Sequence, residues 1–266
     1  MSCRKSSLKL CTICTTGFNL LALLVLTILF ASKVWLYLIE GQWNRLIQGL
    51  GSDLFSRVLM GIHFIGGLTM MTVYPIQKAL MLLGSDKPLI RLTHKLNGIS
   101  GIAAGLITGI FGSAYILYHG TIGGLWMDIG FGIYGVLVFA VSFTLALISA
   151  EMHSNSDYEA LRFYKQLHQY FTSLFGALTY ASLFYRIQYI FANKIVGYEM
   201  PNQCPVQPVC YERPLDRVFI FTFWIIPIVL QSAYAGLLYY KCKRTISALT
   251  ICLSLVLVFS IALLFI

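Results

Sequence analysis

Seven stretches of hydrophobic residues follow one another along the chain, each separated from the next by a short polar or charged segment. Roughly 20 helical residues cross a bilayer core of about 30 Å, and each stretch reaches that length. The stretches are 19–39, 54–83, 94–118, 125–150, 168–191, 218–240 and 245–266. The pattern predicts an all-α fold, a polytopic membrane bundle of seven transmembrane helices around a four-helix centre, in one membrane domain over residues 1–266.

The third stretch carries glycines at helical spacing. At about 100° per residue, every glycine from Gly98 to Gly112 falls within roughly 60° of His94, and so does His119 at the far end. One face of this helix is therefore nearly bare of side chains. Such a face either receives a neighbouring helix at close range or leaves room for a flat cofactor, and the sequence leaves both interpretations open.

The composition supports the membrane assignment. Hydrophobic residues make up 58% of the 266 residues and charged residues only 11%, with a mean hydropathy of +0.77. A soluble domain carries about 25% charged residues. The net charge of +9 is spread over the short segments between apolar stretches, where basic residues determine the orientation of the helices in the membrane. They form no single basic face, so we exclude nucleic acid as a partner.

The distribution of Lys and Arg predicts the orientation. Basic residues gather at the N-terminus and in the loops after the second, fourth and sixth stretches, which share one side of a seven-span bundle. The positive-inside rule then predicts a cytosolic N-terminus and a C-terminus outside. No small-residue cleavage site follows the first stretch, so we expect it to remain as an anchor.

Cys204 and Cys210 lie in the loop between the fifth and sixth stretches, which this topology places outside the cytosol. The spacing CPVQPVC closes a small ring, and its two prolines restrict the chain. Cysteine pairs outside the cytosol commonly form disulfides. We predict a disulfide bond between these two residues.

Histidines carry the candidate ligand chemistry. His94 begins the third stretch and His168 begins the fifth, so both lie at the inner edge of the bundle. Two facing imidazoles are sufficient to hold a low-spin haem iron in a helical bundle. The alternative is that each histidine binds headgroups or caps a neighbouring helix.

Further residues extend this hypothesis. His63 has the apolar neighbours Ile62 and Phe64, which favours a buried polar contact or a functional site. His119 is expected at the interface and His153 in solvent. Arg186 follows His168 by five full turns, so both point the same way, and its guanidinium suits a haem propionate or an acidic substrate. Snorkelling to headgroups is the alternative for Arg186.

The run HFIGGLTMMTVYPIQKAL, followed by RLTHKLNGISGI and KQLHQYFTSLFGALTYASLFYRI, resembles the family of predicted membrane proteins filed as domain of unknown function 2306. The resemblance covers residues 61–190, the four-helix family core. The matching positions are His63, Gly66, Gly67, Pro75, Gln77, His94, Gly98, His168 and Arg186. Lys95, Gln169 and the pair Tyr170-Phe171 depart from the Arg, Arg and Trp-Met of the family.

The resemblance implies a fold and a set of residues, because the family has no established activity. Its histidines, on the second, third and fifth helices, have a layout similar to that of the cytochrome b561 class of transmembrane electron carriers. This is an analogy of fold.

Two functions follow as hypotheses. The first is a transmembrane electron carrier that binds haem b through His94 and His168, with His63 and Arg186 as further cofactor-binding candidates. The second is a non-enzymatic transporter or a scaffold subunit of a membrane complex. The lipid bilayer is the expected environment, and an electron donor or other membrane subunits are the partners implied. A hydrolase is disfavoured because neither a Ser-His-acid set nor an HExxH motif is present.

Overall fold

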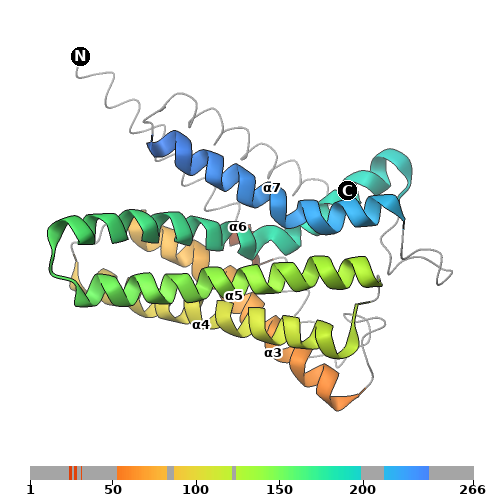
Figure 1. The fold of residues 1–266 in the computed structure, drawn as a ribbon, viewed down its shortest axis with the longest axis horizontal. Coiled ribbons are helices and arrows are strands. Elements are labelled where there is room, and N and C mark those ends of the chain that lie inside the picture. The colour runs from red at the N-terminus through yellow and green to blue at the C-terminus, as the bar shows by residue number, and fades with distance from the viewer. Residues whose placement is uncertain are drawn as a thin grey trace.

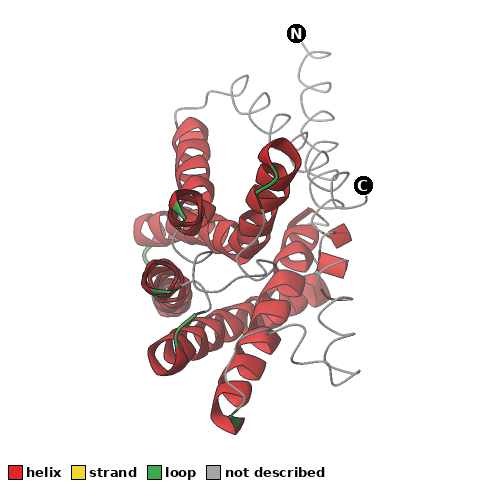
Figure 2. Ribbon diagram, turned by 90° about the vertical axis from the view of Figure 1, so that its right-hand side faces the viewer, coloured by secondary structure: helices red, strands yellow, loops and turns green. Residues whose placement is uncertain are grey.

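The structure is a computed structural model, and it describes residues 24–25, 27–28, 31, 53–82, 87–121, 124–198 and 213–239. Within these residues all regular structure is helical (Figure 2). The five long helices are α3 (Leu54–Leu82), α4 (Pro88–His119), α5 (Leu125–Ser154), α6 (Tyr158–Val196) and α7 (Pro214–Tyr239). The all-α class is thereby confirmed.

Five of the seven predicted helices fall on these elements. The first and seventh stretches lie outside the described residues, apart from a few positions near Thr27, so the count of seven stays a prediction. So do the orientation of the termini and the Cys204–Cys210 disulfide, which also lies outside the described residues.

Four of the described helices, α3, α4, α5 and α7, are long and apolar enough to cross a membrane. Many of their large hydrophobic side chains are exposed on the outside of the bundle, as a lipid-facing surface requires. These features support an integral membrane protein. Polar and charged residues interrupt the apolar stretches of α6, and this helix is not among the four.

The helix ends follow from local chemistry. Pro88 occupies the first turn of α4, where a missing N–H costs nothing. The carboxylate of Asp157 accepts hydrogen bonds from the N–H groups of Glu159 and Ala160 and so starts α6. Gly197 ends α6 in the left-handed conformation at φ 66°. Because the first turns of α6 are polar, the apolar pattern placed the start of this helix at 168, too late.

Consecutive helices pack against each other from α3 to α7, and α7 also contacts α5. Figure 1 shows α4 and α5 side by side and antiparallel, with α3 crossing behind them and α6 and α7 above. Two buried clusters hold this arrangement. One is shared by α3, α4, α5 and α6 around Val138 and Leu178, and the other is rich in aromatic rings around Tyr189 and Phe223.

Pro75 lies inside α3, which continues through it to Leu82. A proline removes one N–H from the helix, so the carbonyl of Met71, four residues earlier, loses its usual donor. The hydroxyls of Tyr180 and Thr27 both donate to this carbonyl, each at 3.1 Å. Side chains of other segments therefore replace the missing hydrogen bond, as the absence of water in a membrane requires.

The glycine face of α4 is occupied by neighbouring helices over most of its length. A methyl group added at Gly101 would lie 2.7 Å from Val73 of α3, and one at Gly105 would lie 2.8 Å from the Phe175 ring of α6. One at Gly109 would lie 2.8 Å from the backbone of Gly135 in α5. Of the two interpretations left open by the sequence, close helix packing holds for this part of the face.

Candidate functional site

A cavity of about 470 Å³ lies among α3, α4, α5 and α6. It is found where α3 and α5 approach their last turns and where α4 and α6 complete their first turns. Its floor and walls are largely apolar, with Val73, Ile102, Leu145 and Phe175 among them. The polar side chains that line it are Tyr74, Gln77, His94, Lys95, Ser149, His153, His168 and Thr172. A cavity of this size suits a small ligand or part of a prosthetic group.

His94 is oriented by a short chain of hydrogen bonds from α3 and α4. Asn97 Nδ2 donates to the Val73 carbonyl at 3.0 Å and to Gln77 Oε1 at 2.8 Å. Gln77 Nε2, turned toward His94 as a result, lies 3.1 Å from His94 Nε2. An amide N–H can only donate, so His94 Nε2 accepts and presents a lone pair. The imidazole is thus neutral, with its proton on Nδ1, in the form that can bind a metal ion.

His168 enters the same cavity from α6. Its Nδ1 is buried and has no hydrogen-bond partner among the described residues. Leaving a buried polar nitrogen unpaired is unfavourable, so each such group calls for an explanation. His94 and Lys78 are both within electrostatic range of His168, which places the three basic groups near one another. A ligand that used the free nitrogen of His168 would account for it.

The lining of the cavity is basic. Lys95 and three histidines contribute to it, and Asp and Glu are absent from the described lining. No group of three or more His, Cys, Asp or Glu suited to a bare metal ion occurs in the described part of the chain. A haem iron needs only two protein ligands, so this finding bears on bare ions alone.

The other sequence-predicted residues lie elsewhere. His63 is outside the cavity lining, and its Nδ1 donates to the Thr108 carbonyl at 2.9 Å, which joins α3 to α4 beside Gly112. Arg186 is exposed on α6 and does not line the cavity. The structure therefore brings His94 and His168 together, without His63 or Arg186.

The two remaining histidines, His119 and His153, lie in the last turns of their helices. His119 ends α4, where it stacks on Tyr115 and lies 3.1 Å from its hydroxyl. His153, expected in a solvated loop, is in the last turn of α5, where it is exposed and also lines the cavity. The apolar stretch ends at residue 150, whereas the helix continues to Ser154 and so includes His153.

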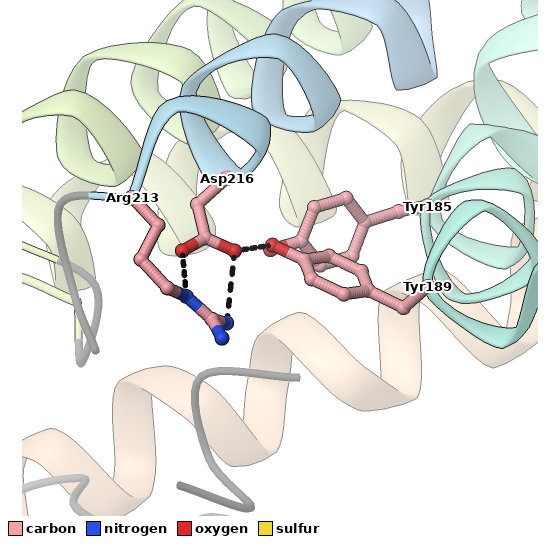
Figure 3. Close-up of polar contacts among 4 residues, drawn as sticks. All are labelled: Tyr185, Tyr189, Arg213 and Asp216. Carbon is pink, nitrogen blue, oxygen red and sulfur yellow. Dashed lines mark hydrogen bonds and ion pairs between the residues drawn. The ribbon is translucent and has the colours of Figure 1, made fainter. Parts of the chain in front are cut away.

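A second polar cluster, not anticipated from the sequence, joins α6 to the start of α7 (Figure 3). The Tyr189 hydroxyl donates to the buried carboxylate of Asp216 at 2.6 Å, and Tyr185 donates to Tyr189 at 3.3 Å. Arg213 forms an ion pair with Asp216 at 3.0 Å. The spacings of these pairs, three residues for Arg213 and Asp216 and four for the tyrosines, were the only signal available in the sequence.

Tyr198, just after α6, completes this second cluster. The Arg213 guanidinium lies over its ring, 3.9 Å from the centroid. Burial, followed by the nearby Asp216 carboxylate, raises the pKa of the Tyr198 hydroxyl to about 12. With a neutral phenol, a paired carboxylate and a paired guanidinium, the cluster is suited to hold α6 and α7 together.

Comparison with protein-family models finds no match to this chain. Comparisons with curated proteins and with solved structures find none either. The resemblance to domain of unknown function 2306 and the analogy with the cytochrome b561 class therefore stay predictions.

Proposed function

We propose that this integral membrane protein binds one haem b between His94 and His168 and carries electrons. The observation that carries the proposal is that two imidazoles, from α4 and α6, line one cavity. His94 accepts a hydrogen bond from Gln77 at Nε2, and His168 has a buried Nδ1 without a partner among the described residues. Two neutral imidazoles are the usual axial ligands of a b-type haem in a helical bundle.

The residues around the two histidines fit such a group. Gly98 lines the cavity one turn after His94, and the lack of a side chain there lets a ligand approach the α4 backbone. The remaining walls are largely apolar, as the faces of a macrocycle require. Haem b supplies one-electron chemistry when it is bound, and the surrounding protein sets its potential.

The chain's own residues have separable tasks in this proposal. Asn97 holds Gln77, and Gln77 holds the His94 ring in the neutral form with its lone pair on Nε2. His168 offers its free nitrogen from the opposite helix. Gln77 donates to His94 Nε2, so this hydrogen bond would have to break before that nitrogen could bind iron. Gln77 would thereby tune how readily His94 becomes a ligand.

The second candidate is a non-enzymatic transporter or scaffold subunit. One observation favours it: helices α3, α5 and α6 fill the glycine face of α4 from Gly101 to Gly109. In that case the histidines bind water, each other or a small solute. The two candidates differ in whether a haem is bound.

An absorption spectrum decides between them. We expect the full chain, expressed with haem supplied and purified, to show a six-coordinate low-spin spectrum in the oxidised and the dithionite-reduced state. His94→Ala and His168→Ala should each abolish it, because one imidazole cannot complete the coordination.

The matched controls are the two histidines at the bundle ends, which were not predicted to bind the cofactor. His119→Ala removes a ring that stacks on Tyr115 at the far end of α4, and His153→Ala removes an exposed ring at the edge of the same cavity. Both should retain the spectrum. If the wild type binds no haem, or if both ligand variants keep the wild-type spectrum, the haem proposal is refuted and the transporter or scaffold remains.

A further inference from the structure

Two lysines lie close to the cavity without an acidic partner. Lys95 lines it from α4, directly after His94. Lys78 follows Gln77 on α3, with its Nζ 5.4 Å from the centroid of the Tyr74 ring, and it is within electrostatic range of His168. Among the described residues the one ion pair is Arg213–Asp216, so neither lysine is paired with a carboxylate there.

This arrangement is costly without a ligand. A positive charge in a membrane bundle is unfavourable unless an opposite charge or a polar group compensates it. Lys78 is half-buried and within electrostatic range of His168, whereas Lys95 is exposed where it lines the cavity. An anionic group in the cavity would compensate the half-buried charge of Lys78.

We infer that Lys78 and Lys95 bind the carboxylates of the group held between His94 and His168. The inference rests on the proposed function, since haem b carries two propionates, and it replaces Arg186 in that role. Arg186 lies five helical turns from His168, about 27 Å along the axis at 1.5 Å per residue. One haem cannot reach both, whereas the two lysines are beside the cavity that His94 and His168 line. Each ammonium would donate charge-assisted hydrogen bonds to a propionate oxygen.

Haem b dimethyl ester separates the two contributions. It has the same iron and the same ring as haem b but no carboxylates, so it keeps the bonds to the histidines and loses those to the lysines. We expect the full chain in nanodiscs to bind haem b about tenfold more tightly than the ester. The difference should shrink as the salt concentration is raised.

Single substitutions locate the effect. Lys78→Met and Lys95→Met keep an apolar stem of similar length and remove the charge. Each should weaken haem b binding about tenfold and leave the affinity for the ester unchanged. Lys95→Arg should restore most of the affinity for haem b. Lys194→Met, at an exposed position near the end of α6, is the matched control and should change neither affinity.

The outcomes for the two proposals differ. If haem b binds with a six-coordinate spectrum, yet the ester binds equally well and both lysine variants are silent, the lysines do not bind the carboxylates. The haem proposal stands in that case. If neither haem b nor the ester binds, the proposed function is refuted and the inference falls with it. A lysine variant that binds neither the ester nor haem b has a disrupted cavity. That result also contradicts the assigned role, because the lysines should affect only the ligand that carries carboxylates.

Discussion

Replacing Tyr189 by Phe tests whether the polar cluster at the start of α7 stabilises the packing of α6 against α7. The substitution removes one hydroxyl and keeps the ring, so the edge-to-face contact with Phe219 at 5.0 Å is preserved. The hydroxyl that is lost donates to the Asp216 carboxylate at 2.6 Å, and Tyr189 is 1% exposed. The effect on stability should therefore come mainly from this hydrogen bond, with a smaller part from the one that Tyr189 accepts from Tyr185 at 3.3 Å.

A hydrogen bond to a charged group contributes about 1.5–3 kcal/mol. Asp216 keeps its ion pair with Arg213 at 3.0 Å, so the carboxylate is not left without a partner. We therefore expect Tyr189→Phe to lower the free energy of unfolding by about 2 kcal/mol. Tyr185→Phe removes only a bond between two neutral hydroxyls at 3.3 Å, and about 0.5–1 kcal/mol is expected.

The assay is reversible unfolding by SDS in mixed micelles, followed by tryptophan fluorescence. Tyr158→Phe is the matched control, because Tyr158 is 77% exposed at the start of α6 and should change the free energy of unfolding by less than about 0.5 kcal/mol. If Tyr189→Phe is as stable as Tyr158→Phe, the cluster does not stabilise this part of the bundle, and the reasoning from the 2.6 Å bond is wrong.

Three further predictions concern helix packing, the proline in α3 and the acid dependence of stability. Gly109→Ala places a methyl group 2.8 Å from the backbone of α5 and should destabilise the protein by about 1–3 kcal/mol in the same assay, whereas Gly132→Ala, with open space around it, should be neutral or stabilising. Tyr180→Phe removes a donor to the Met71 carbonyl, which Pro75 deprives of its helical donor, and should lower the free energy of unfolding by about 1 kcal/mol. In a Pro75→Ala background the helical N–H is restored, so the same substitution should cost less. Equal costs in both backgrounds would contradict this explanation. Hydrogen bonds from the Ser56 N–H and hydroxyl hold the pKa of Asp53 below its usual 3.8. The Asp53 carboxylate therefore stabilises the folded protein above that pH, and this stabilisation is lost as the pH falls through the folded-state pKa. Asp53→Asn should weaken the acid dependence of stability below about pH 4, and an unchanged profile would refute this assignment.

The sequence by itself determined the helices. Without water in the bilayer core, the backbone must satisfy its own hydrogen bonds, so long apolar stretches have few alternatives to a helix. Local chemistry marked several ends, such as Pro88 at the start of α4. Where the helix extends past the apolar stretch, as in α6 from Tyr158 and α5 to Ser154, the hydrophobic pattern could not show it.

The candidate site could be predicted only in part. His94 and His168 were identified from their type and position, and they do line one cavity. The amide chain from Asn97 through Gln77 depends on how α3 packs against α4, because two residues 20 positions apart meet only there. The same is true of His153, whose place beside the cavity depends on where α5 ends.

Only the tertiary structure decided what the glycines of α4 contact and which buried polar groups find partners. A bare helix face can receive a helix or a ligand equally well, and the choice depends on the distance and crossing of neighbouring helices. Asp216 similarly reads as an ordinary residue near the start of a helix until Tyr189, from another helix, is seen to donate to it. Helical periodicity is a property of one segment, whereas cavities and buried polar clusters are properties of several segments at once, and for that reason the sequence could predict the helices but not these contacts.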